Sequence, residues 1–189
     1  MGRSLSARQA REIDSRVTES LLNALRETSR PKALEERSNA LSTTATYEEN
    51  TMKITVEKKV AAPIEQVWHA WTTPEDIKQW NVACEDWHTT AATVDLRVGG
   101  SFSARMEAKD GSTGFDFGGT YTKIVEHKLI ECSFGDRSMQ VEFRPGKDGV
   151  TIHETFDAET SNSEEQQRQG WQAILNNFAK YVEAKQVTQ

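Results

Sequence analysis

The segment from Trp80 to His88, WNVACEDWH, holds the greatest variety of reactive side chains in any short stretch of the chain. It offers a thiol at Cys84, carboxylates at Glu85 and Asp86, and an imidazole at His88. Loops at the mouth of a scaffold often carry binding groups. His88 is therefore a candidate ligand contact and a weak candidate for a catalytic acid or base. The alternative is a partly buried histidine that is simply hydrogen-bonded.

A metal site is not expected in this segment. Cys84 and His88 are separated by three residues, which could bring two ligands together. A tetrahedral zinc site usually needs a second ligand pair, and the sequence has no further cluster of Cys and His. It also has no glycine-rich phosphate loop, nucleophile elbow or helical HExxH motif. The sequence thus predicts neither a metal nor a cofactor.

A second weak catalytic candidate is Glu154, in the segment VTIHETFDA. On a strand, Val150, Ile152, Glu154 and Phe156 share one face, because side chains alternate with a period of two. Glu154 is the acid expected among apolar neighbours, and such a carboxyl often has a perturbed pKa. The alternative is a position at a strand edge or bulge, from which Glu154 reaches solvent.

Aromatic residues are more numerous than a sheet–helix interface of this size needs. All five Trp and all seven Phe residues follow Met52. They could line an apolar cavity, since ligand pockets are mostly apolar with few polar groups. Alternatively, they could simply fill the core. The residues we predict to line a cavity are Trp80, Trp87, His88, Phe102, Phe117, Tyr121, Phe156, Trp171, Leu175 and Phe178.

The chain divides at Met52. Residues 1–51 contain eight basic and eight acidic residues, and Tyr47 is their only aromatic residue. One apolar helical stripe followed by a polar linker predicts a helical or disordered extension. Residues 52–189 contain the rest of the aromatic residues and should form the folded domain. Met52 stands directly before the first predicted strand, which makes it a candidate initiator.

Composition excludes several classes of protein. The net charge is −6, which disfavours binding to the phosphate backbone of nucleic acids. No stretch approaches the roughly 20 apolar residues of a membrane span. Two cysteines are too few for a disulfide scaffold, and no export signal is evident. We therefore expect a cytoplasmic protein with reduced thiols.

The pattern of elements predicts an α+β fold. ITVEKKV reads as a strand, and two short helices follow, with Pro63 and Pro74 near their starts. Ser163 and Gln166 form a capping-box pattern before a long amphipathic helix. The strands expected between the helices are TVDLRV, SFSARMEA, GFDFGGTYTKIVEH, KLIECSF, SMQVEFR and VTIHETFDA. The glycines of GFDFGGTY are predicted to allow twist or a bulge.

Several motifs together resemble the SRPBCC (START-like, helix-grip) superfamily, in particular the bacterial relatives of the activator of heat-shock protein 90 ATPase. They are AAPIEQVWHAWTTPEDIKQW, DLRVGGSFSARMEAKDG, GFDFGGTYTKIVEHKLI and GWQAILNNFAKYVE. The resemblance covers about residues 52 to 186. It implies a curved antiparallel sheet of six to seven strands around the C-terminal helix. It leaves function open, because the superfamily includes ligand carriers, lipid binders, ring cyclases and cochaperone domains.

The leading functional hypothesis is non-catalytic binding of a small, largely apolar molecule between the sheet and the last helix. One alternative is a cochaperone-type module whose partner is a chaperone or another protein. The other is a cyclase- or hydrolase-like enzyme that uses His88 or Glu154. A binding protein needs an open cavity, whereas an enzyme needs two or more polar groups converging on one point.

Overall fold

A computed structural model describes residues 52–186, so the predicted helix and linker of residues 1–51 lie outside the described residues. Strand β1 is followed by two short helices, six more strands and a long helix. The elements are β1 (Lys53–Val60), α2 (Ile64–Thr72), α3 (Pro74–Trp80), β2 (Trp87–Val94), β3 (Ser101–Ala108), β4 (Gly114–Val125), β5 (Leu129–Phe134), β6 (Arg137–Gly146), β7 (Gly149–Asp157) and α4 (Glu164–Gln186).

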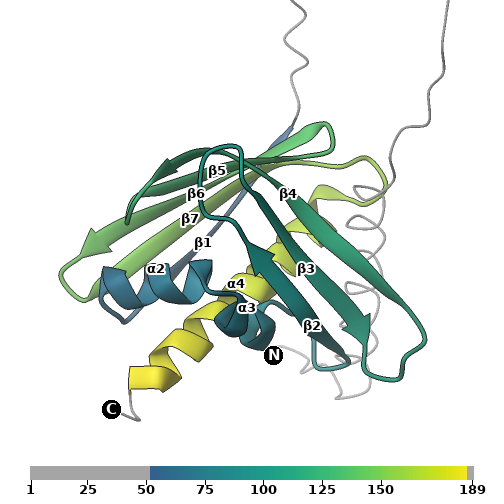
Figure 1. The fold of residues 1–189 in the computed structure, drawn as a ribbon, viewed down its shortest axis with the longest axis horizontal. Helices are drawn as coiled ribbons and strands as arrows, with labels where there is room; N and C mark the ends of the chain where they lie inside the picture. Colours follow the sequence, from purple (N-terminus) through teal and green to yellow (C-terminus); the bar gives the residue numbers. More distant parts are fainter. Residues whose placement is uncertain (1–51, 187–189) are drawn as a thin grey trace, which may run out of the picture.

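The seven strands form one antiparallel sheet in the order β1-β7-β6-β5-β4-β3-β2. The sheet is curved, and the three helices lie on its concave side, with α4 crossing beneath the strands (Figure 1). The α+β helix-grip fold predicted from the sequence is therefore confirmed, with seven strands. This arrangement leaves an interior that is bounded by the sheet above and by α4 below.

The prediction for the region around β2 was wrong in its boundaries. The sequence predicted a strand over residues 93–98 and placed Trp87 in a loop. In the structure, the strand begins at Trp87 and ends at Val94. Residues 95–100 form a tight loop, in which the amide of Asp95 donates to the carbonyl of Ser101 at 2.9 Å. Gly99 has a φ of 80°, a conformation that a strand cannot continue through and that glycine adopts readily.

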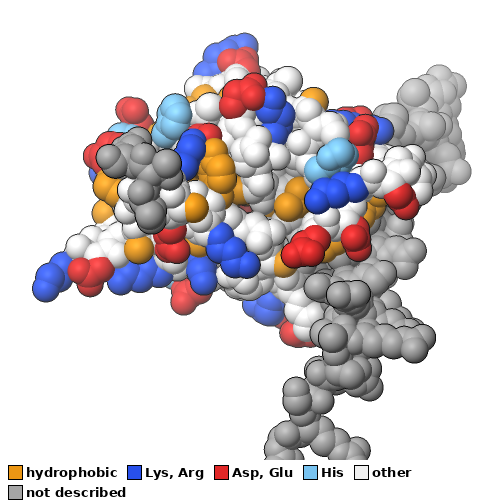
Figure 2. Space-filling model, turned by 90° about the horizontal axis from the view of Figure 1, so that it is seen from below, with side chains coloured by type: hydrophobic (Ala, Val, Ile, Leu, Met, Phe, Trp, Pro, Cys, Tyr) orange, Lys and Arg blue, Asp and Glu red, His pale blue; other side chains and the backbone are white. Residues whose placement is uncertain are grey.

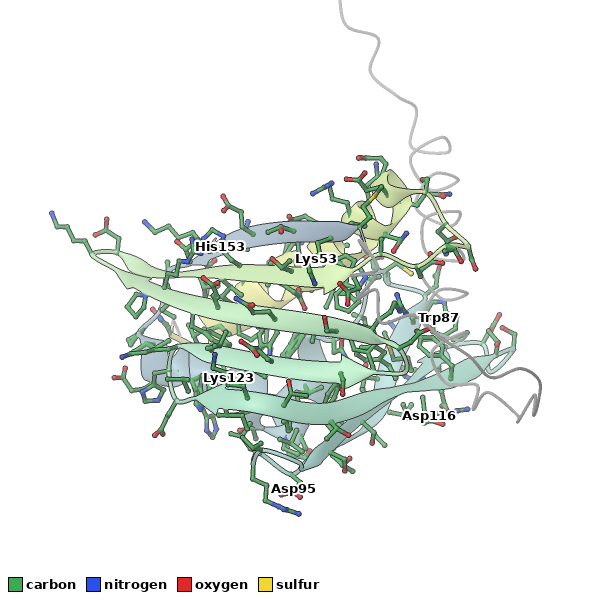
Figure 3. The ribbon with its side chains drawn as sticks, turned by 90° about the horizontal axis from the view of Figure 1, so that it is seen from above. Lys53, Trp87, Asp95, Asp116, Lys123 and His153 are labelled. Atoms are coloured by element: carbon green, nitrogen blue, oxygen red, sulfur yellow. The ribbon has the colours of Figure 1, made fainter. Side chains whose placement is uncertain are left out.

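The two faces of the sheet differ in character. Along β5, β6 and β7, every second side chain is buried, and these residues form the core together with α4. The outer face carries polar side chains, including Lys123 of β4 and His153 of β7 (Figure 3). Lys123 pairs with Glu131 at 3.3 Å, and His153 lies 3.2 Å from Glu57. Because side chains alternate between the two faces along β7, Glu154 lies on the inner face, whereas the preceding His153 lies on the outer face.

Helix α4 begins at the predicted capping box. The Ser163 amide donates to the Gln166 side chain at 3.0 Å, and the Gln166 amide donates to the Ser163 hydroxyl at 3.2 Å. The helix also covers the free edge of β1. Arg168 donates to the carbonyl of Thr55 at 2.7 Å, and Gln172 donates to the carbonyl of Glu57 at 3.1 Å. These bonds occupy edge groups that could otherwise pair with another strand.

The short helices pack their aromatic rings against α4. Trp71 of α2 stacks on Trp80 of α3 with ring centroids 5.2 Å apart. Phe178 of α4 meets both rings edge-on, at 4.9 Å in each case. The indole N–H of Trp80 donates to the carbonyl of Ala70 at 3.0 Å, so this ring is held in place. The cluster closes one end of the interior.

Candidate functional site

A cavity of about 90 Å³ lies between the sheet and α4. Strands β2 to β7 supply most of its wall, α4 contributes two residues, and α2 and α3 with the residue after α3 close one side. Its lining residues are Trp71, Ile77, Trp80, Asn81, Thr93, Val94, Phe102, Ser103, Ala104, Met106, Phe117, Tyr121, Ile130, Cys132, Met139, Glu154, Trp171 and Ile174. Most of these side chains are apolar, as is usual for a site that binds small molecules.

Aromatic rings form one wall of the cavity. Phe102 of β3 lies 5.2 Å from Tyr121 and 6.0 Å from Phe117, both on β4. Phe117 meets the ring of Trp171 of α4 at 6.0 Å. Gly119 stands opposite Phe102 in the sheet, and a Cβ atom there would come within 3.0 Å of the Phe102 ring. The missing side chain therefore makes room for the Phe102 ring.

Among the described residues, Glu154 is the one acidic or basic residue in the cavity lining. It is buried, with 4% of the residue exposed. Burial raises the pKa of its carboxyl to about 8, because an apolar environment disfavours the ionised form. Within residues 52–186, the carboxyl forms no hydrogen bond and no ion pair, and its oxygens open onto the cavity. It is therefore mostly protonated at neutral pH, and it has no partner in the described part of the chain.

Two further titratable groups line the cavity with Glu154. Cys132 of β5 faces inward, and burial, with a contribution from the Glu154 charge, raises the pKa of its thiol to about 12. Tyr121 pairs with Cys132 across β4 and β5, and burial raises the pKa of its hydroxyl as well. All three groups are uncharged or mostly uncharged near pH 7. None of them is an activated nucleophile, which requires a lowered pKa or an adjacent base.

One part of the lining reaches solvent. Thr93 of β2 is exposed, and its hydroxyl lies 2.8 Å from that of Ser103 of β3. Asn81, which follows α3, is half-buried, and its carbonyl accepts a hydrogen bond from the Thr89 hydroxyl at 2.6 Å. These polar residues form the rim of the cavity between β2, β3 and the end of α3.

Half of the residues that we predicted to line a cavity do so. The structure brings together Trp80, Phe102, Phe117, Tyr121 and Trp171. Phe156, Leu175 and Phe178 are fully buried but lie outside the lining. Phe156 stacks on Trp171 at 4.4 Å and so supports the wall from behind.

Trp87 and His88 also lie outside the lining. Trp87 is the first residue of β2, and it packs against Phe115 at 5.9 Å. His88 is exposed, which follows from the alternation of β2: Trp87 and Thr89 point inward and His88 points outward. The structure therefore places the imidazole on the outer face of the sheet, and Glu154 is the weak catalytic candidate that faces the cavity.

The sequence reading missed several lining residues, among them Ala104, Met106, Ile130, Cys132 and Met139. The strand alternation could have identified them, because each lies on the buried face of its strand. Cys84 is a half-buried free thiol. Within residues 52–186, no group of three or more His, Cys, Asp or Glu residues could hold a metal ion.

A family model described as "Activator of Hsp90 ATPase homolog 1-like protein" matches residues 61–183. The chain belongs to this family. The match includes all of the cavity lining, and the resemblance to the SRPBCC superfamily drawn from the sequence is thereby confirmed. A search of curated proteins returned no match.

Three solved structures illustrate the similarity. An AHSA1-like protein from Aeromonas hydrophila is 48% identical, with a TM-score of 0.69, over 72% of this chain and 95% of that one. A protein from Cytophaga hutchinsonii is 46% identical, with a TM-score of 0.62, over 72% and 96%. A protein from Chromobacterium violaceum is 25% identical, with a TM-score of 0.64, over 70% and 98%. Family membership supports a ligand-binding or cochaperone-like fold.

The exterior offers fewer indications of function. The face seen from below carries acidic and basic side chains interspersed with small apolar areas (Figure 2). The large apolar side chains exposed within the described residues are Met52, Leu96, Val98 and Val125. Within residues 52–186, no helix is long and apolar enough to cross a membrane.

Proposed function

We propose that this protein binds a small, largely apolar molecule in the cavity between the sheet and α4, without catalysing a reaction. The observation that carries the proposal is the cavity itself, whose walls are mostly apolar and aromatic. Unfilled apolar space lacks dispersion contacts that a ligand can supply. A dry apolar cavity of about 150 Å³ is known to bind benzene. The cavity of about 90 Å³ extends to an exposed rim, so a single ring or short chain is the expected size.

The polar groups favour binding over catalysis. Tyr121, Cys132 and Glu154 are all mostly protonated near neutral pH, because burial raises each pKa. A protonated Glu154 could serve as a general acid but not as a general base, and a nucleophilic thiol must be a thiolate, which Cys132 is not. His88 lies outside the lining and is exposed, so it does not complete a convergent set.

A protein-interaction module of the cochaperone type is the second candidate. The family description names activators of the Hsp90 ATPase, and this favours a chaperone or another protein as partner. Leu96 and Val98 in the loop after β2 are exposed and offer an apolar contact. We also propose that the protein is cytoplasmic and that residues 52–189 form one folded unit. Both proposals are based on the sequence.

A ligand titration followed by amide chemical shifts in the full chain tests the binding proposal. Toluene is a suitable probe, and its shifts should saturate and cluster on β3, β4 and the Trp171 end of α4. Ala104→Leu fills the cavity from a lining position and should abolish these shifts. Ala91→Leu, at an exposed position of β2, is the matched control and should leave them unchanged. Equal shifts in the wild type and Ala104→Leu would refute the proposed site.

A further inference from the structure

The cavity contains a buried acid that the protein itself does not satisfy. Glu154 lines the cavity with 4% of its surface exposed, and within residues 52–186 its carboxyl forms no hydrogen bond or ion pair. Its oxygens are not among the side-chain atoms that are fully closed off without a partner, so they open onto the cavity. Buried polar groups nearly always have a partner, and leaving one unsatisfied costs stability. An acid that borders free space and has no partner therefore points to a group supplied by a bound molecule.

The surroundings of Glu154 define what that group can be. Glu154 stands in β7 between Val56 of β1 and Val141 of β6. From β5, Cys132 is close enough for the Glu154 charge to raise the pKa of its thiol, and Tyr121 of β4 lies opposite Cys132. None of the lining residues is Lys, Arg or His. The lining formed by the described residues thus presents neutral hydrogen-bonding groups, Glu154, Cys132 and Tyr121 among them, and no positive charge.

We propose that Glu154 anchors the head group of the bound molecule, and that this head group is uncharged and both donates and accepts hydrogen bonds, as a hydroxyl or a primary amide does. This inference rests on the proposed function and specifies its ligand class. The apolar body of the molecule then lies against Phe102, Phe117 and Trp171, with its other end toward the rim at Thr93.

The chemistry of a protonated carboxyl explains the choice. It offers one O–H donor and a carbonyl acceptor, so a hydroxyl or an amide can form both bonds at once. A carboxylate ligand would bring a negative charge into a cavity that lacks a cation, and such a charge is costly to bury. An ammonium ligand would have to lose its hydration shell, and Glu154 would have to ionise in an apolar site. Carboxylates should therefore be excluded, and amines should bind weakly.

Two matched pairs of probes test this inference on the full chain at pH 7, by amide chemical shifts. Phenol and toluene have similar size and differ in the hydroxyl group; benzamide and benzoate differ in charge. We expect the wild type to bind phenol about tenfold more tightly than toluene, as one good hydrogen bond implies. We also expect it to bind benzamide at least tenfold more tightly than benzoate.

Two variants test whether the Glu154 side chain causes the preference for phenol over toluene. Glu154→Leu replaces the carboxyl with an apolar group of similar volume, and it should reduce the phenol-to-toluene preference to less than about twofold. Glu154→Gln keeps a donor and an acceptor, so it should retain most of the preference. A melting curve of each variant confirms that it is folded.

The outcomes separate this inference from the proposed function. If the wild type binds toluene and phenol equally, or benzoate as well as benzamide, the head-group inference is overturned while apolar binding stands. If none of the four probes shifts the cavity residues, the binding function itself is refuted. The comparison of probes on the wild type decides the matter even if a variant does not fold.

Discussion

The α3–α4 junction and the cavity each bury one carboxyl group, and they treat it in opposite ways. At the junction, Asp76 of α3 is 6% exposed, and its Oδ1 accepts hydrogen bonds from the Tyr181 hydroxyl and the Lys185 ammonium, at 2.5 Å each. Its Oδ2 lies 3.8 Å from the His69 imidazole and has no hydrogen bond. In the cavity, Glu154 is equally buried but has no such partner within the described residues.

The packing of the two regions differs as well: one is filled by side chains and the other contains free space. Where α2 and α3 meet α4, the rings of Trp71, Trp80 and Phe178 contact one another with centroids 4.9 to 5.2 Å apart, and Phe178 lies outside the cavity lining, to which Trp71 and Trp80 belong. Glu154, in contrast, borders the free space of the cavity. An acid with partners on a neighbouring helix joins the two helices, as Asp76 joins α3 to α4. An acid without partners beside free space supports our proposal that a bound molecule supplies its partner.

The largest expected effect is a difference in stability loss between two Phe→Ala substitutions, one in the packed region and one in the cavity wall. Phe178→Ala should lower the free energy of unfolding by about 3–5 kcal/mol, because Phe178 is fully buried among Trp71 and Trp80. Phe102→Ala should cost less, because Phe102 is half-buried in the cavity wall, yet it should weaken toluene binding. Denaturant unfolding and the shift titration measure the two effects. Equal losses of stability would contradict the difference in packing.

The second-largest expected effect is a pH dependence of the free energy of unfolding, caused by the titration of Glu154. The folded state holds the proton up to a pKa of about 8, whereas the ordinary value is 4.5. The stability contributed by the protonated carboxyl is therefore fully present below about pH 4.5 and is lost as the pH rises toward 8. Between pH 5.5 and 7.5, the loss should be on the order of 2 kcal/mol.

Glu154→Gln removes this titration and is the natural control. Its free energy of unfolding should not show the decline that the wild type shows over this range, while Cys132 and Tyr121 stay protonated in both proteins. Chemical denaturation at a series of pH values measures the difference. Parallel curves for the two proteins would show that Glu154 is ionised, or solvated, in the folded state.

A smaller effect is expected at the partnered acid. Tyr181→Phe removes the hydroxyl that donates to Asp76 at 2.5 Å. Because Tyr181 is half-buried and Lys185 still donates to the same oxygen, the cost should be about 1 kcal/mol. Toluene binding should be unchanged, since Tyr181 does not line the cavity. A change in binding without a change in stability would link the junction to the cavity.

The smallest effect concerns the extension. Removal of residues 1–51 should leave the melting temperature within about 2 °C, because the aromatic core lies wholly after Met52. Scanning calorimetry of the two chains tests this. A loss of several degrees would mean that the extension packs on the domain.

The fold was largely predictable because it depends on local patterns. The capping box at Ser163 and Gln166 set the start of α4, and the alternation on β7 assigned Glu154 to the buried face. The start of β2 was not predictable, because Trp87 lies in a polar segment and only the pairing with Ala108 of β3 makes it a strand residue.

The position of the cavity was harder to predict for a geometric reason. Trp171, Leu175 and Phe178 share one stripe of α4, and the sequence treats them alike. In the structure, Trp171 reaches the cavity, whereas Leu175 and Phe178 lie farther along the helix, where packing is complete. Where free space begins along a buried stripe depends on the curvature of the sheet and the placement of α2 and α3, which no local pattern encodes.

The most direct test of apolar binding is a crystal structure of the protein under xenon pressure, with the xenon located by its anomalous scattering. Apolar cavities take up xenon, whereas hydrated polar ones hold ordered water. We expect a xenon atom between Phe102, Phe117 and Trp171, and none there in a crystal of Ala104→Leu. A wild-type cavity that holds only ordered water would contradict the central claim.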